Sequence, residues 1–117
     1  MTGTGPSGAR RVIGPGRLLI GAGQASGAGN NTLLTPVAGF AIRVHYASYN
    51  PAADAEIGFR FGAAGNIWLR NNVIAKSVIA KDFGDLRFIQ GEPNEALILN
   101  LSAGTVTDWT VFYLEVN

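Results

Sequence analysis

Two stretches in the middle of this chain alternate apolar side chains with polar or small ones. Because the side chains of a strand point alternately to its two faces, a period of two indicates strands that are buried on one side. Turn-forming residues occupy positions 50–54 between the two stretches. The apolar positions are Phe40, Ile42, Val44 and Tyr46 in the first stretch and Ile57, Phe59 and Phe61 in the second.

Further strand-like segments follow, separated by turn residues at intervals of about ten residues. They cover residues 66–70, 73–84, 86–89, 96–102 and 109–116. The motif VIAK occurs twice within 73–84, five residues apart, so we expect a bulge or bend near Ser77. No segment has sustained helical periodicity. The chain is therefore predicted to be all-β, a single β-sandwich (jelly-roll-like) or a barrel of about eight strands.

The last two strands are the most apolar. In residues 96–102 the leucines at positions 97, 99 and 101 share one face, whereas residues 109–116 carry apolar side chains on both faces. A strand that is apolar on both faces is buried on both, either inside its own domain or against another subunit. Candidates for a subunit interface are Trp109, Val111, Phe112, Tyr113 and Leu114.

The N-terminal part of the chain differs from the rest in composition. Residues 1–31 hold nine of the sixteen glycines and three arginines but no acidic residue, whereas residues 32–117 hold six basic and eight acidic residues. A segment so rich in glycine loses much conformational entropy when it becomes ordered. We therefore predict a flexible basic arm over residues 1–31, with one short strand at 17–22, followed by a β-sandwich domain over 32–117.

Composition excludes several functions. Charged residues make up 15% of the 117 residues, against roughly 25% in typical soluble domains, so part of the surface is expected to be covered by a partner. The chain has no cysteine for disulfides or thiolate ligands. It has no apolar stretch long enough for a membrane span, and its N-terminus does not look like a signal peptide. Three arginines neutralise only about three phosphates, so no nucleic-acid partner is expected.

Candidate catalytic residues are few. His45 is the only histidine and lacks the further ligands that a zinc site needs, so a structural role is favoured. Paired carboxylates can hydrolyse glycosides, which makes a small hydrolase one hypothesis, but turn capping is the commoner use of such residues. These carboxylates are Asp82, Asp85, Glu92 and Glu95. We expect no enzyme activity and no catalytic, metal or cofactor site.

Exposed aromatic side chains offer a different possibility, because they can stack on sugar rings. Trp68 and Arg70 lie on a short predicted strand between loops. They are the candidate glycan contacts.

Three stretches carry a resemblance to a known group of proteins. These are NTLLTPVAGFAIRVHYASY, GEPNEALILNLSAG and the ending VFYLEV. Together they resemble small β-sandwich structural proteins of tailed bacteriophage virions, of the capsid decoration or cement type. The resemblance implies a virion protein without catalysis, made in the host cytoplasm and located on the capsid surface. It further implies a homotrimer whose other partner is the major capsid protein.

Under this resemblance, the N-terminal arm is expected to bind the outer capsid surface and so stabilise the shell. Arginines would meet acidic groups of the capsid, and apolar residues would anchor the contact. The candidates are Arg10, Arg11, Val12, Ile13, Arg17, Leu18, Leu19 and Ile20. The alternative function is a carbohydrate-binding head-fibre or tail-associated module, which would use Trp68 and Arg70.

Overall fold

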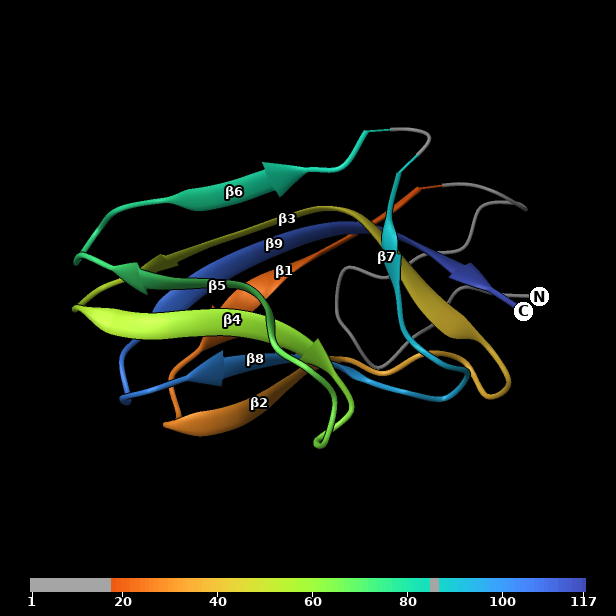
Figure 1. Ribbon diagram of the computed structural model, residues 1–117, viewed down its shortest axis with the longest axis horizontal. Helices are drawn as coiled ribbons and strands as arrows, with labels where there is room; N and C mark the ends of the chain where they lie inside the picture. The colour runs from red at the N-terminus through yellow and green to blue at the C-terminus, as the bar shows by residue number, and fades with distance from the viewer. Residues whose placement is uncertain (1–17, 85–86) are drawn as a thin grey trace.

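Two antiparallel β-sheets packed face to face form the fold in the computed structural model, which describes residues 18–84 and 87–117 (Figure 1). Sheet A has the strand order β1-β9-β3-β6, with β7 also paired to β3, and sheet B has the order β2-β8-β4-β5. The described residues contain no helix. The strands are β1 Leu19–Ala25, β2 Gly29–Leu34, β3 Ala41–Pro51, β4 Ala55–Phe61, β5 Trp68–Val73, β6 Ile79–Asp82, β7 Ile89–Gln90, β8 Leu97–Leu101 and β9 Thr107–Val116. The prediction of an all-β sandwich is confirmed.

The core lies between the inner faces of the two sheets. The alternation predicted for residues 56–61 and 96–102 is confirmed, because both strands turn their large apolar side chains inward. Sheet B contributes Ile57, Phe59, Phe61, Leu97, Leu99 and Leu101, all at most 7% exposed. Sheet A contributes Leu19, Ile42, Val44, Ala47, Tyr49, Trp109, Val111 and Tyr113. Burial of these side chains is the main favourable term in the stability of the fold.

A β-bulge in β3 corrects the face predicted for this strand. Val44 pairs with Tyr113 and Tyr46 pairs with Phe112, so His45 is an extra residue opposite β9. Its carbonyl oxygen accepts a hydrogen bond from Phe83 N at 2.8 Å. The extra residue moves Tyr46 from the predicted inner face to the outer one.

Residues 19–31, which the sequence placed in the arm, contribute β1 and part of β2 to the two sheets. β1 pairs with β9 along its whole length, from Leu19 to Ala25. A Cβ atom on Gly21 would lie 2.9 Å from Leu34 Cδ2 and 3.3 Å from Trp109 Cζ3. This glycine therefore makes room for core side chains and is not part of a linker. The strand predicted at 17–22 is found at 19–25, and residues 1–17 lie outside the described residues.

The repeated VIAK motif does not form one bulged strand. β5 ends at Val73, and residues 74–78 cross from sheet B to sheet A, where β6 begins. Lys76 has a φ of 66° and donates its N–H to Pro51 O at 2.7 Å within this crossing. Of the strand predicted at 86–89, Ile89 is in β7 and Leu86 is outside the described residues.

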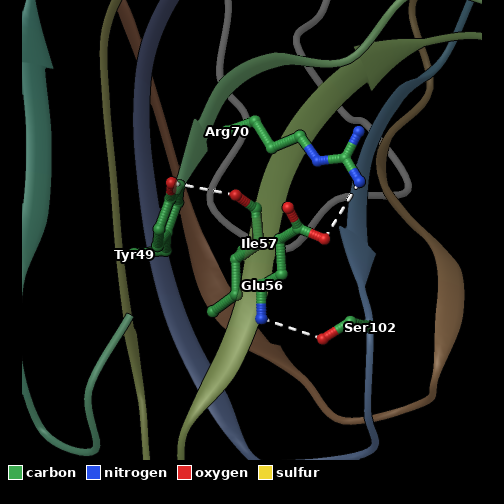
Figure 2. A network of polar contacts seen from close by, with 5 residues as sticks. All are labelled: Tyr49, Glu56, Ile57, Arg70 and Ser102. Atoms are coloured by element: carbon green, nitrogen blue, oxygen red, sulfur yellow. Dashed lines mark hydrogen bonds and ion pairs between the residues drawn. The ribbon is translucent and has the colours of Figure 1, made fainter. Parts of the chain in front are cut away.

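One buried hydroxyl links the two sheets. Tyr49 of β3 is 1% exposed, and its hydroxyl lies within hydrogen-bonding distance of two carbonyl oxygens of sheet B, Ile57 O at 3.1 Å and Leu69 O. Asn71 Nδ2 donates to the same hydroxyl at 3.2 Å. Figure 2 shows the ring reaching from β3 towards Ile57. Burial raises the pKa of Tyr49, and the hydrogen bond from Asn71 opposes this shift.

The raised pKa of Tyr49 predicts a loss of stability at alkaline pH. Below about pH 10 the hydroxyl is protonated in the folded and unfolded states. At higher pH the unfolded state releases the proton first, so the free energy of unfolding falls. Tyr49→Phe should be about 1–3 kcal/mol less stable at neutral pH, because a buried carbonyl oxygen of sheet B loses its donor. Its free energy of unfolding should fall less steeply above pH 10 than that of the wild type. Urea unfolding between neutral pH and about pH 11 measures how the free energy of unfolding of each protein changes with pH. Equal slopes for the wild type and Tyr49→Phe would contradict a raised pKa of Tyr49.

The packing of Gly21 gives a second prediction, on a matched pair of neighbours in β1. Gly21→Val should lower the free energy of unfolding by about 2 kcal/mol, because its side chain enters the space of Leu34 and Trp109. Ala22→Val should change it by less than about 0.5 kcal/mol, because Ala22 is exposed. Urea unfolding compares the two variants. If both were neutral, β1 would belong to a flexible arm after all.

Candidate interaction surface

The outer face of sheet A carries two cross-strand rows of uncharged side chains, which we call the A face. The register places Ile20, Phe112 and Tyr46 side by side on β1, β9 and β3. The next row consists of Ala22, Thr110, Ser48 and Ala80. The A face is thus defined by these seven residues on four neighbouring strands.

The first row of the A face is bulky and the second is small. The rings of Tyr46 and Phe112 lie 4.8 Å apart, and Ile20 is 52% exposed. Leu114, half-buried, continues the apolar area along β9. Charges lie at the borders of the face, and they belong to Asp82 beside Tyr46, Arg43 beside Leu114, and Asp108 beside Gln24.

The outer face of sheet B carries charged and amide side chains around one buried apolar residue, Ile98. Asn100 Nδ2 donates to Asn30 Oδ1 at 2.8 Å across β8 and β2. Next to this pair, the register places Thr32, Ile98 and Arg60 in one row. Glu56 and Asn72 form the row towards the far end of β4. The two outer faces of the sandwich therefore differ in charge, because the rows of sheet B include Arg60 and Glu56, whereas the seven residues of the A face are uncharged.

The predicted subunit-interface residues divide between the core and this surface. Trp109 is 7% exposed, and Val111 and Tyr113 are completely buried inside this single chain. They close its own core and have no surface left for a partner, which corrects their assignment. Phe112 and Leu114 point outward and remain candidates.

The predicted capsid contacts divide in a similar way. Leu18 and Ile20 are about half exposed, whereas Leu19, at 5%, points into the core and is withdrawn from the candidates. The other five, Arg10, Arg11, Val12, Ile13 and Arg17, lie outside the described residues.

The predicted glycan contacts are not arranged for stacking on a sugar. The ring of Trp68 stacks on Phe59 at 5.0 Å and lies 5.6 Å from Phe61. Arg70 is exposed and forms an ion pair with Glu56 at 2.9 Å (Figure 2). The hydrogen bond from Arg70 lowers the pKa of Glu56. The sequence could not reveal that the Trp68 ring packs against Phe59 and Phe61 of sheet B.

A shallow groove of about 400 Å³ lies at one end of sheet B, lined by Asp54, Glu56, Asn72 and Ser102 among others. Three of its polar side chains already make contacts within the fold, namely Asp54, Ser102 and Glu56. Asp54 Oδ1 accepts from Ala75 N at 2.8 Å, and Ser102 Oγ accepts from Glu56 N at 2.8 Å (Figure 2). The groove contains no nucleophile paired with a base, so it suggests no reaction.

Three of the remaining candidates for chemistry, His45, Asp82 and Glu95, have structural partners. His45 Nδ1 lies 3.0 Å from Gly84 O. Asp82 accepts a hydrogen bond from Gly84 N, and Glu95 accepts one from Glu92 N, both at 2.8 Å. Asp85 lies outside the described residues. Within the described part of the chain, no group of three His, Cys, Asp or Glu residues could hold a metal ion, and no helix is long and apolar enough to span a membrane.

The aromatic packing of Trp68 predicts a structural effect of its removal. Trp68→Ala should lower the free energy of unfolding by about 2–3 kcal/mol, because the ring loses its contacts with Phe59 and Phe61. Arg70→Ala should leave the unfolding midpoint almost unchanged, because an exposed ion pair contributes little. Denaturant unfolding measures both. A Trp68→Ala protein of normal stability that no longer bound glycans would instead support a carbohydrate site.

Comparison with known proteins gives little further guidance. No protein-family model and no curated protein matches this chain. A chain in the solved structure titled "Cyanophage Pam1 capsid asymmetric unit" is similar to it at 14% sequence identity, with a TM-score of 0.47. The match covers 92% of this chain and 94% of that one. A likeness of this degree carries no functional argument, so function has to be inferred from the surfaces of the chain itself.

Proposed function

We propose that this chain is a structural protein of a tailed-bacteriophage virion, more specifically a decoration or cement protein on the capsid surface. In this role it is made in the host cytoplasm, assembles as a homotrimer and binds the major capsid protein through its N-terminal segment. It stabilises the shell and catalyses no reaction.

The observation that carries this proposal is the contrast between the two outer faces of the sandwich. The seven residues of the A face carry no charge, and the nearest charge in their rows is Asp82 on the edge strand β6. The outer face of sheet B carries Glu56, Arg60 and Arg70. A protein that coats a shell needs one surface that other subunits cover and another that remains exposed to solvent. The low content of charged residues, 15%, has the same explanation.

The connectivity of the sheets supports the same class of protein. Sheet A has the order β1-β9-β3-β6 and sheet B the order β2-β8-β4-β5, so that the first and last strands are neighbours within one sheet. We take this order to be that of a jelly roll, an architecture used by viral capsid and lectin domains. The step from fold to role is an analogy.

The N-terminal segment is the proposed attachment device. Residues 1–17 carry Arg10, Arg11 and Arg17 and no acidic residue. They lead directly to Leu18 and Ile20, whose side chains are about half exposed. The basic segment and this apolar pair together suit an acidic capsid surface with an apolar neighbour. Many copies on a lattice raise the effective affinity of such a contact.

The alternative, a carbohydrate-binding head-fibre or tail-associated module, has no specific observation in its favour. The aromatic ring that it requires, Trp68, packs on Phe59 and Phe61. It therefore remains an outcome of the test below.

Binding to capsids tests the proposal. Capsids of the virus that encodes this chain, prepared without it, are mixed with the full-length protein and sedimented. We expect co-sedimentation, and a rise in the temperature at which the shells open. Deletion of residues 1–16 should weaken binding by at least about tenfold, or about 1.4 kcal/mol, while the circular dichroism spectrum and melting temperature stay the same, because β1 begins at Leu19.

Two results would contradict parts of this proposal. Undiminished binding of the truncated protein would refute attachment through the N-terminal segment. Failure of the full-length protein to bind capsids, together with hits on a glycan array, would favour the carbohydrate-binding module.

A further inference from the structure

We infer that the A face is the surface through which copies of this chain associate with one another. The inference rests on the part of the proposed function in which the chain assembles with itself. It pairs copies in twos and does not by itself give the homotrimer, because a face that packs against the same face of another copy is related to it by a twofold axis. Self-association can be measured without a capsid, so an experiment can contradict this inference without contradicting capsid binding, and the reverse.

The first argument is charge. In a symmetric assembly, residues near a symmetry axis meet the same residues of another copy. A charge at that position meets its like, at a cost in free energy. The row from Ala22 to Ala80 contains no charge, and the row from Ile20 to Tyr46 contains none until it ends at Asp82 on the edge strand β6. The outer face of sheet B has Arg60 and Glu56 on β4, so self-association through this face would cost more free energy.

The second argument is shape. The row of Ala22, Thr110, Ser48 and Ala80 leaves a low strip beside the bulky row that contains Phe112 and Tyr46. Sheets that pack face to face lie about 10 Å apart and interdigitate large side chains with small ones. A bulky row next to a low strip is the pattern that allows one copy to fit against another.

The third argument is area. β9 has ten residues, which span about 34 Å at about 3.4 Å each, and four strands span about 19 Å. The whole outer face of sheet A, with the A face at its centre and the charged borders included, therefore measures at most about 600 Å². Two such outer faces that covered each other completely would bury about 1,200 Å², which is the lower end of the range for stable protein interfaces.

The edge of the A face supports a protein chain as the occupant. Among the described residues, β1 has a sheet neighbour on one side only, β9. β1 contains no charge and no proline, and its pairing with β9 has no register shift. The opposite edge, β6, carries Lys81 and Asp82 and is only four residues long. Charges, bulges and short length normally prevent edge strands from attracting other chains, and β1 lacks these devices.

The test is the mass of the full-length protein in solution, without capsids, by sedimentation equilibrium over a range of micromolar concentrations. The variants are Ile20→Lys and Ala22→Lys on the A face, with Thr32→Lys as the matched control. All three positions are exposed on edge strands, and each variant adds one positive charge. Melting temperatures verify that each variant is folded.

We expect the wild type to associate and Thr32→Lys to keep its dissociation constant. Ile20→Lys and Ala22→Lys should weaken association by at least about a hundredfold, the effect of placing like charges at a contact between copies. A monomeric wild type overturns the inference, as does association that survives both A-face variants or is lost equally in the control. If the wild type is monomeric and Ile20→Lys weakens only capsid binding, the A face contacts the capsid instead.

Discussion

The whole structure depends on the burial of two inner sheet faces against each other. The chain has no cysteine to form a disulfide, and the Glu56–Arg70 ion pair is exposed. Stability must therefore come mainly from apolar side chains such as Phe59, Leu99 and Val111, which are completely buried. The Tyr49 hydroxyl adds a polar link across the same interface. Features that look irregular in the sequence are explained by this demand for burial.

The bulge at His45 and the glycines of β1 are two such features. Without the extra residue, β3 could not bury Val44 and also Ala47 and Tyr49. Without a small residue at position 21, Trp109 and Leu34 would lose their space. Both features also shape the outside of the molecule. The bulge turns Tyr46 outward beside Phe112, and β1 places Ile20 on the other side of Phe112. The bulge and the small residue at position 21 therefore determine both the packing of the core and the arrangement of side chains on the A face.

The sequence predicted those parts of the fold in which alternation is uninterrupted. β4 and β8 have a clear period of two, and their inner faces are the predicted ones. β1 was predicted as a short strand at 17–22 but was placed in the arm and not in a sheet, because a glycine that makes room for a tryptophan looks the same in the sequence as a glycine in a linker. The bulge at His45 and the crossing after Val73 were missed because each depends on pairing with a distant strand. Such pairings leave no local signal.

The candidate site was predicted only in part, for a related reason. β9 is apolar on both faces, and its sequence alone left open which face was core and which was surface. The register with β1 and β3 decides this, because Val111 and Tyr113 pair with core residues whereas Phe112 pairs with Ile20 and Tyr46. A row formed by three strands exists only in the folded sheet, and these three residues lie far apart in the sequence. Alternate residues of one strand thus stabilise the domain and provide its apolar outer surface, so the positions of the surface side chains are set by the packing of the core beneath them.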